Sequence, residues 1–163
     1  MTYPPELLKN FRQSLFEIFK NAFEHSYTKH GIFVCGQFFP RKKRLNFSIA
    51  DLGVGIRGNI YRNIGKKFLP ANAINWATSG KTTRRKNSGR PGGLGFQLIK
   101  DFITLNGGRL IIVSDSGYWE FSQGHPLTRD LPVPFPGTVV TVEINTAEQM
   151  NYLSTEVDLK NIF

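Results

Sequence analysis

The chain has 163 residues, of which 40% are hydrophobic and 13% aromatic, and these proportions are typical of a folded domain rather than of a disordered chain. No apolar run approaches the roughly 20 residues that cross a bilayer, and residues 1–5 lack the charged and apolar regions of a signal peptide. The formal net charge of +9 indicates an anionic partner, such as a nucleotide, a nucleic acid or an acidic protein.

The single cysteine, Cys35, lies within an apolar stretch and cannot form a disulfide within the chain. This fits the reducing conditions of the cytoplasm, and a small buried hydrophobic side chain is the more common role of such a residue. The sequence shows neither an internal repeat nor a domain boundary. We therefore expect one domain over residues 1–163, with a core over about residues 5–145 and a polar tail over residues 146–163.

Residues 5–26 are predicted to form a helix, because their apolar side chains recur at the spacing of one helical face. Glu17, Asn21 and His25 follow one another at intervals of four residues, so they form a polar stripe beside the apolar face. A polar stripe at the border of a buried face is a place from which a helix can line a pocket.

Residues 31–39 and 45–50 predict a β-hairpin. Its turn carries the basic cluster Arg41-Lys42-Lys43-Arg44, for which a solvated turn is the more common role. The second strand delivers Asp51 at its end, where glycines follow.

The middle of the chain predicts short helices separated by loops. Residues 57–65 are compatible with a short helix or an irregular loop, whereas residues 70–78 predict a helix with Pro70 in its first turn. Residues 79–91 are basic, polar and without apolar periodicity, which predicts a mobile loop. Residues 93–105 again have helical spacing.

The last third of the chain predicts strands. Residues 109–114 and 118–122 are expected to form a hairpin around residues 115–117, and residues 138–145 a final strand. Residues 124–136 contain four prolines and are expected to form a loop. Because strands are grouped rather than alternating with helices, we expect an α+β fold in which helices cover one face of a mostly antiparallel sheet.

Asp51 stands at a strand end before Gly53 and Gly55. A carboxylate in such a place can accept a hydrogen bond from the exocyclic amine of adenine, while glycines allow the backbone to approach the base closely. Ordinary turns contain the same residues, so the Asp-x-Gly-x-Gly pattern alone favours a turn.

The predicted helix over residues 93–105 opens with Gly92, Gly93 and Gly95. Free amides and the positive end of the helix dipole attract phosphate at such a position. No Gly-Lys-Ser/Thr follows and no predicted strand precedes, which excludes a Walker A loop and a dinucleotide-binding fold. A glycine-rich helix entry without any ligand is the alternative.

Asn21 lies in the middle of the first predicted helix, where Asn costs up to ~0.7 kcal/mol relative to Ala. Its side-chain carbonyl can bind Mg²⁺, which keeps several waters and shares the oxygens of phosphates. Glu17, one helical turn earlier, can orient or deprotonate a water aimed at a terminal phosphate. For Glu17 alone an exposed polar position is the more common role, and His25 is expected to be structural.

Taken together, these motifs resemble the GHKL superfamily, whose members include gyrase B, MutL-type mismatch-repair proteins, heat-shock chaperones and sensor histidine kinases. The resemblance extends over about residues 5–145. It implies the Bergerat fold, a two-layer α/β sandwich that binds ATP with Mg²⁺. The matching motifs are Glu17-x-x-x-Asn21-Ala22-x-x-His25, Asp51-x-Gly53-x-Gly55, Gly92-Gly93-Leu94-Gly95-Phe96 and Gly137-Thr138.

The resemblance implies a role for individual residues. Asn21 would be the metal ligand, Asp51 would read the adenine and Thr138 would lie beneath it. The segment over residues 78–91 would be the lid over ATP, with Lys81 the best candidate among its basic residues for a phosphate contact. The base pocket would be shaped by Gly53, Gly55 and Ile56, and the phosphates would be bordered by Gly92, Gly93, Leu94, Gly95 and Phe96.

In ATP-hydrolysing members of the superfamily, the acid at the position of Glu17 resembles a general base. Histidine kinases and anti-sigma-factor serine kinases often carry an acid there as well, so Glu17 leaves hydrolysis and phosphotransfer open. The predicted nucleotide helix starts almost at Met1, which leaves no room for the dimerisation helix of a histidine kinase. The second domain of a gyrase or MutL protein is also missing. We therefore expect a stand-alone ATP-binding module or a fragment of a larger protein.

Three functions follow from the sequence. The first is an ATPase or ATP-gated switch that acts with a partner protein or a partner domain on another chain. The second is a serine/threonine protein kinase of the anti-sigma-factor type. The third, from another class, is a nucleic-acid-binding module that uses the basic turn over residues 41–44, but this cluster lacks interleaved aromatic side chains aimed at bases.

Overall fold

The computed structural model of the protein describes residues 5–81 and 94–147, and no helix within these two ranges is long and apolar enough to cross a membrane. The elements in chain order are α1 (Pro5–His25), β1 (Ile32–Phe39), a 3₁₀ turn (Pro40–Lys42), β2 (Arg44–Asp51), α2 (Gly55–Ile64), α3 (Pro70–Thr78), α4 (Leu94–Asn106), β3 (Arg109–Ser122) and β4 (His125–Asn145).

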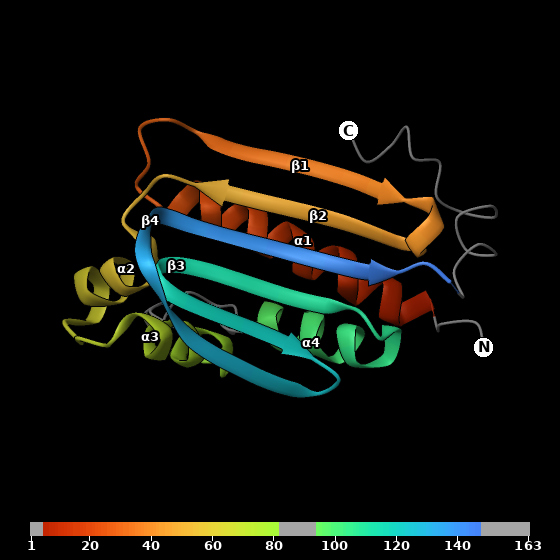
Figure 1. Ribbon diagram of the computed structural model, residues 1–163. Coiled ribbons are helices and arrows are strands. Elements are labelled where there is room, and N and C mark those ends of the chain that lie inside the picture. The colour runs from red at the N-terminus through yellow and green to blue at the C-terminus, as the bar shows by residue number, and fades with distance from the viewer. Residues whose placement is uncertain (1–4, 82–93, 148–163) are drawn as a thin grey trace.

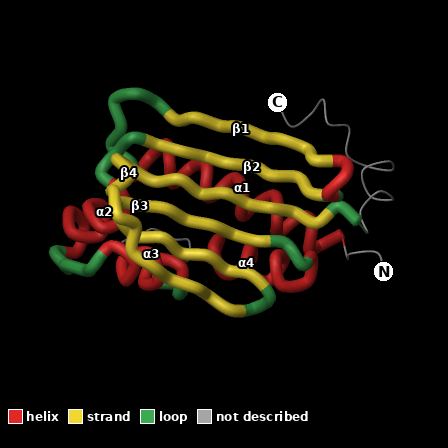
Figure 2. The backbone as a smooth tube through the Cα atoms, in the orientation of Figure 1, coloured by secondary structure: helices red, strands yellow, loops and turns green. Residues whose placement is uncertain are grey.

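The strands form one sheet in the order β1-β2-β4-β3, and every pair of neighbours is antiparallel. The helices lie on one face of this sheet, with α1 behind β2 and β4 and α4 beside it, as Figures 1 and 2 show. The predicted fold class is confirmed: the protein is an α+β sandwich with an antiparallel sheet and one layer of helices.

The core lies between the sheet and the helices. Phe11 of α1 stacks on Phe102 of α4 with 4.0 Å between ring centroids, and this contact joins the two long helices. Burial of one such aromatic side chain contributes about 1.5–3 kcal/mol. The other buried apolar side chains of the core come from both layers and are Ile18, Ile49, Ile74, Ile99, Ile103, Leu110, Ile112, Trp119, Phe121, Val140, Val142 and Ile144.

The helices agree with the predicted ranges. α1 and α3 confirm the helices expected over residues 5–26 and 70–78, and Pro70 is in the first turn of α3. The segment left open as helix or loop forms α2, which starts earlier than expected, at Gly55. The loop expected over residues 79–91 falls mostly outside the described residues.

β3 contains both strands of the second predicted hairpin. Arg109 Nε lies 3.5 Å from Glu120 Oε1, although eleven residues of straight strand would span about 36 Å. The strand therefore folds back on itself, as Figures 1 and 2 also show. The reversal falls where the register with β4 shifts, and Asp115 there has a φ of 54°.

The loop expected over residues 124–136 is wrong, because β4 begins at His125. In this half of the strand β4 pairs with β3 alone, so a proline that lacks an N–H loses no hydrogen bond on the free side. The register moves from Asp130, opposite Gly117, to Phe135, opposite Asp115, and the prolines at 132 and 134 fall inside this irregular step.

The expectation that Cys35 is buried is also wrong, since its side chain is exposed. β1 is the edge strand of the sheet. Phe33 and Phe38 of the same strand remain 54% and 50% exposed. An apolar run therefore does not identify a buried strand when the strand lies at an edge.

Candidate functional site

A cavity between the helices and the end of the sheet gathers the predicted site residues, although they are spread from Glu17 to Thr138. Leu94 begins α4, Gly53 lines a second hollow formed in part by the β2–α2 loop, and Gly92 and Gly93 lie outside the described residues. The predicted residues that line the cavity are Glu17, Asn21, Asp51, Gly55, Ile56, Lys81, Gly95, Phe96 and Thr138.

Asp51, at the end of β2, is only 4% exposed. Its Oδ1 accepts a hydrogen bond from the backbone N–H of Gly53 at 2.9 Å. Burial raises the pKa of this carboxyl, while hydrogen bonds from the backbone N–H groups of Gly53 and Thr138 lower it in part. The carboxylate is thus held in place from the backbone, and its remaining lone pairs can serve a donor in the cavity.

The glycines after Asp51 are required by packing. A Cβ at Gly53 would overlap the carbonyl of Ser26, and the next residue, Val54, donates its backbone N–H to that same carbonyl at 2.8 Å. Gly55 has a φ of +69°, a backbone conformation that residues with side chains rarely adopt. The β2–α2 loop therefore packs directly against the end of α1. This close contact excludes a side chain at position 53, a restriction that an ordinary turn does not impose.

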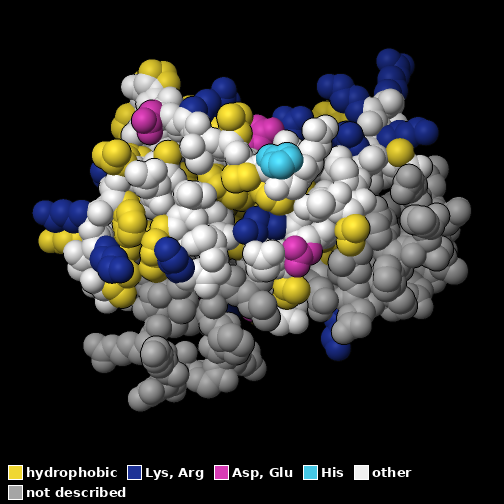
Figure 3. Space-filling model, turned by 90° about the horizontal axis from the view of Figure 1, so that it is seen from below, with side chains coloured by type: hydrophobic (Ala, Val, Ile, Leu, Met, Phe, Trp, Pro, Cys, Tyr) yellow, Lys and Arg dark blue, Asp and Glu magenta, His cyan; other side chains and the backbone are white. Residues whose placement is uncertain are grey.

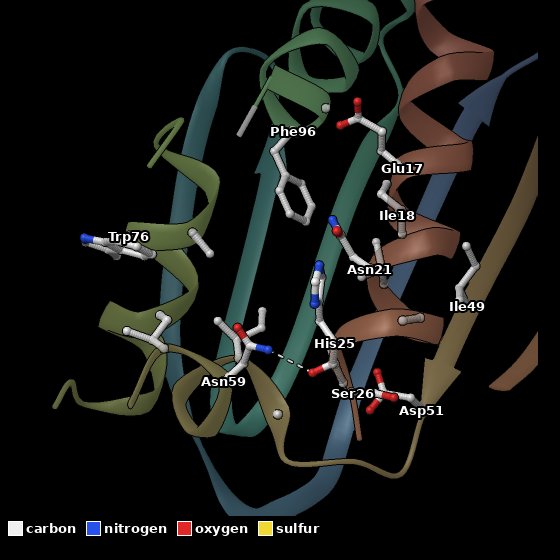
Figure 4. A pocket seen from close by; sticks show the side chains of 18 of the residues that line it. Glu17, Ile18, Asn21, His25, Ser26, Ile49, Asp51, Asn59, Trp76 and Phe96 are labelled. Atoms are coloured by element: carbon white, nitrogen blue, oxygen red, sulfur yellow. Dashed lines mark hydrogen bonds between the residues drawn. The ribbon is translucent and has the colours of Figure 1, made fainter. Parts of the chain in front are cut away.

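Asn59 of α2 completes this contact, because its Nδ2 donates to the carbonyl of His25 at 2.9 Å (Figure 4). This hydrogen bond links α2 to the last residue of α1 beside the cavity. His25 itself lines the cavity at the last turn of α1. The sequence analysis missed Asn59. Its polar side chain lies on the face of α2 that lines the cavity, and this position is the only signal for it.

Glu17 and Asn21 project from α1 into the cavity, on the side toward Phe96 of α4 (Figure 4). Glu17 lies against the first turn of α4: a Cβ at Gly95 would overlap its Oε2. Glycine at position 95 therefore allows a carboxylate to approach the N-terminal turn of the helix. The predicted polar stripe does face one cavity together with Gly95 in the first turn of α4.

Ser114 of β3 was missed by the sequence analysis, although it is 2% exposed and lies directly behind the cavity wall. Its Oγ accepts the backbone N–H of Ile56 at 2.8 Å and donates to the carbonyl of Gly137 at 3.0 Å. It also lies 3.1 Å from Oγ1 of Thr138. A signal was available, because Ser114 continues the buried alternation of Leu110 and Ile112 with a polar side chain.

The basic side chains near the cavity have different surroundings. Lys81 lines the cavity and is exposed. Lys100 of α4 donates from Nζ to the carbonyl of Thr78 at 2.9 Å, and burial lowers the pKa of its ammonium group. Lys100 thus holds the end of α3, from which residues 79–81 lead away.

On the face of the molecule in Figure 3, basic side chains are more prominent than acidic ones. Figure 3 views the molecule from below, and on this face Lys and Arg side chains lie at both ends and near the middle, whereas acidic side chains are few. Such a distribution attracts anions. Within residues 5–81 and 94–147, no group of three or more His, Cys, Asp or Glu residues could hold a metal ion alone.

A comparison with protein-family models agrees with this arrangement. The model described as "Histidine kinase-, DNA gyrase B-, and HSP90-like ATPase" matches residues 7–148, which include nearly all of α1 and every later element through β4. No curated protein matches the chain.

Proposed function

The chain belongs to the family of histidine kinase-, DNA gyrase B- and HSP90-like ATPases, and we propose that it binds Mg-ATP in the cavity described above and acts as an ATPase or ATP-gated switch together with a partner protein. One observation carries this proposal. A buried carboxylate, an amide, a second carboxylate and the first turn of a helix, which come from three distant parts of the sequence, border one cavity.

The base end of ATP is assigned to Asp51 and Thr138. The carboxylate of Asp51 would accept a hydrogen bond from the exocyclic amine of adenine, and the apolar side chains of Ile49, Ile56 and Val140 in the cavity wall would contact the ring. Because Asp51 is already fixed by two backbone donors, the base would meet a preformed acceptor.

The phosphate end is assigned to Asn21, Lys81 and the start of α4. Asn21 fits the needs of Mg²⁺, which is commonly held by one or two protein oxygens together with phosphate oxygens and waters. When bound, Mg²⁺ would neutralise charge on the phosphates. The backbone of the first turn of α4, at Gly95, and the ammonium group of Lys81 would add positive potential at the same end.

Glu17 is assigned the proton transfer. Its carboxylate lies against Gly95, so it would face the terminal phosphate if the phosphates bind at the start of α4. There it would accept a proton from an attacking water, which gives hydrolysis. A serine or threonine hydroxyl of another protein could lose its proton to the same carboxylate, and this keeps the serine/threonine kinase as the alternative.

A partner protein is supported by the other flank of α1. Phe16 and Phe23, which helical spacing places away from the polar stripe, are 68% and 72% exposed. The basic turn over residues 41–44 lies at the opposite end of β2 from Asp51 (Figure 1), so it does not contribute to this cavity. We therefore do not propose the nucleic-acid-binding function.

The products of ATP turnover test this proposal. The purified chain is incubated with Mg-ATP labelled at the γ-phosphate, alone and with a candidate partner. Release of labelled inorganic phosphate supports the ATPase, and label on a serine or threonine of the partner supports the kinase. Absence of Mg-ATP and Mg-ADP binding in calorimetry would contradict the common basis of both.

A further inference from the structure

The hydroxyl of Ser114 lies within hydrogen-bonding distance of three polar groups but has only one proton to donate. It accepts the backbone N–H of Ile56 at 2.8 Å, and it lies 3.0 Å from the carbonyl oxygen of Gly137 and 3.1 Å from the hydroxyl oxygen of Thr138. A serine hydroxyl carries one proton and two lone pairs. The carbonyl of Gly137 can only accept, so the proton of Ser114 goes to it, and the hydroxyl of Thr138 must donate to Ser114.

Burial fixes this arrangement. Ser114 is 2% exposed and Gly137 is also buried, and a buried polar group that loses its partner costs more than one that faces water. The space around the hydroxyl is narrow as well, since a Cβ at Gly55 would come within 2.9 Å of Ser114 Oγ. The direction of the three hydrogen bonds is therefore set before any ligand enters.

This arrangement sets the direction in which the hydroxyl of Thr138 donates its proton, and Thr138 lines the cavity. With its proton turned to Ser114, Thr138 presents only lone pairs to a ligand. Thr138 stands opposite Asp51 in the β2–β4 register, and the carboxylate of Asp51 is also an acceptor. The base end of the cavity thus offers two acceptors side by side.

We propose that Ser114 is a positioning residue for base selection: by holding the Thr138 hydroxyl as an acceptor, it makes the cavity favour a purine with an amino group at the position facing Asp51 and Thr138 over one with a keto oxygen there. This inference rests on the proposed nucleotide binding. An amino group donates to both acceptors, whereas a keto oxygen would meet two acceptors and gain no hydrogen bond. Without Ser114, the Thr138 hydroxyl can rotate and donate to the keto oxygen.

The test measures selectivity rather than affinity alone. Mg-ADP and Mg-IDP are titrated by calorimetry into the wild type, Ser114→Ala, Thr138→Val and the double variant; in IDP a keto oxygen replaces the amine and the neighbouring ring nitrogen N1 carries a proton. The wild type should bind ADP more tightly than IDP. Each single variant should lower this preference by about three- to tenfold, the worth of one neutral hydrogen bond. The double variant should lower it no further, because Ser114 acts through Thr138.

The chain offers a matched control. Ser48 and Thr141 form another serine–threonine hydrogen bond between neighbouring strands, with 2.8 Å between their hydroxyl oxygens, and neither lines the cavity. Ser48→Ala should keep the wild-type preference for ADP. If Ser114→Ala does not fold, Thr138→Ser, which keeps the hydroxyl, should retain the preference that Thr138→Val loses.

Several outcomes would overturn the inference. The preference for ADP could persist in Ser114→Ala and Thr138→Val, or the two losses could multiply in the double variant. Equal binding of ADP and IDP by the wild type would also overturn it while leaving nucleotide binding intact. Failure of the wild type to bind either nucleotide would instead contradict the proposed function, and the inference with it.

Discussion

The two ends of the cavity are built differently. At the base end, Asp51 and Ser114 are 4% and 2% exposed and are fixed by hydrogen bonds to the backbone. At the phosphate end, Glu17 and Asn21 are only half-buried, and Glu17 is placed by its packing against Gly95. Under the proposed function, a preformed base end would select the ligand, and an accessible phosphate end would leave oxygen atoms free for a metal ion, a water or a second protein.

Glu17→Gln should have the largest effect and should be confined to the phosphate end. Loss of a general base typically lowers the rate by about 10²–10⁴-fold, and the base end would be unaffected. We therefore expect phosphate release to fall by that order in a steady-state assay while the affinity for Mg-ADP changes little. Glu24→Gln, on the same helix but exposed, serves as the control. A parallel loss of ADP affinity in Glu17→Gln would erase the distinction between the two ends.

Gly95→Ala tests whether packing places Glu17. The new methyl group would overlap the Glu17 carboxylate, so either the side chain or the start of α4 must move. We expect phosphate release to fall at least about tenfold, since a displacement of about 1 Å can cost as much as a hundredfold. Gly36→Ala, where a Cβ meets only ordinary contacts, should leave the rate unchanged. A fully active Gly95→Ala variant would show that Glu17 does not need its place against α4.

The pH dependence of binding should reflect the base end. Burial raises the pKa of Asp51 above its usual 3.8, and the ionised carboxylate accepts a stronger hydrogen bond from an adenine amine than the protonated carboxyl does. Mg-ADP affinity, measured by calorimetry, should therefore fall as the pH decreases through this raised pKa. In the nucleotide-free protein the same group binds its proton more tightly when folded, so it makes the free energy of unfolding fall as the pH rises from 3.8 through the raised pKa. If the affinity for Mg-ADP did not change with pH, this result would contradict the assignment of the buried Asp51 carboxylate as the acceptor of the adenine amine.

The sequence predicted the parts of the molecule that depend on local chemistry. Pro70 in a first helical turn located α3, and the stripe of Glu17, Asn21 and His25 does face a cavity. The proline-containing half of β4 was predicted as a loop, because only the sheet topology shows that one side of that strand is free. Local spacing also could not reveal that the Oγ of Ser114 meets groups from α2 and β4.

The most direct test of the account is the affinity of the chain for Mg-ADP in calorimetry, compared between the wild type and Asp51→Asn. Loss of a hydrogen bond to a charged group should weaken binding by about ten- to a hundredfold, because the amide cannot replace both acceptor oxygens. Asp130→Asn, an exposed carboxyl on β4, should bind as the wild type does. Unchanged affinity in Asp51→Asn, or no binding by the wild type, would contradict the assignment of this cavity to ATP.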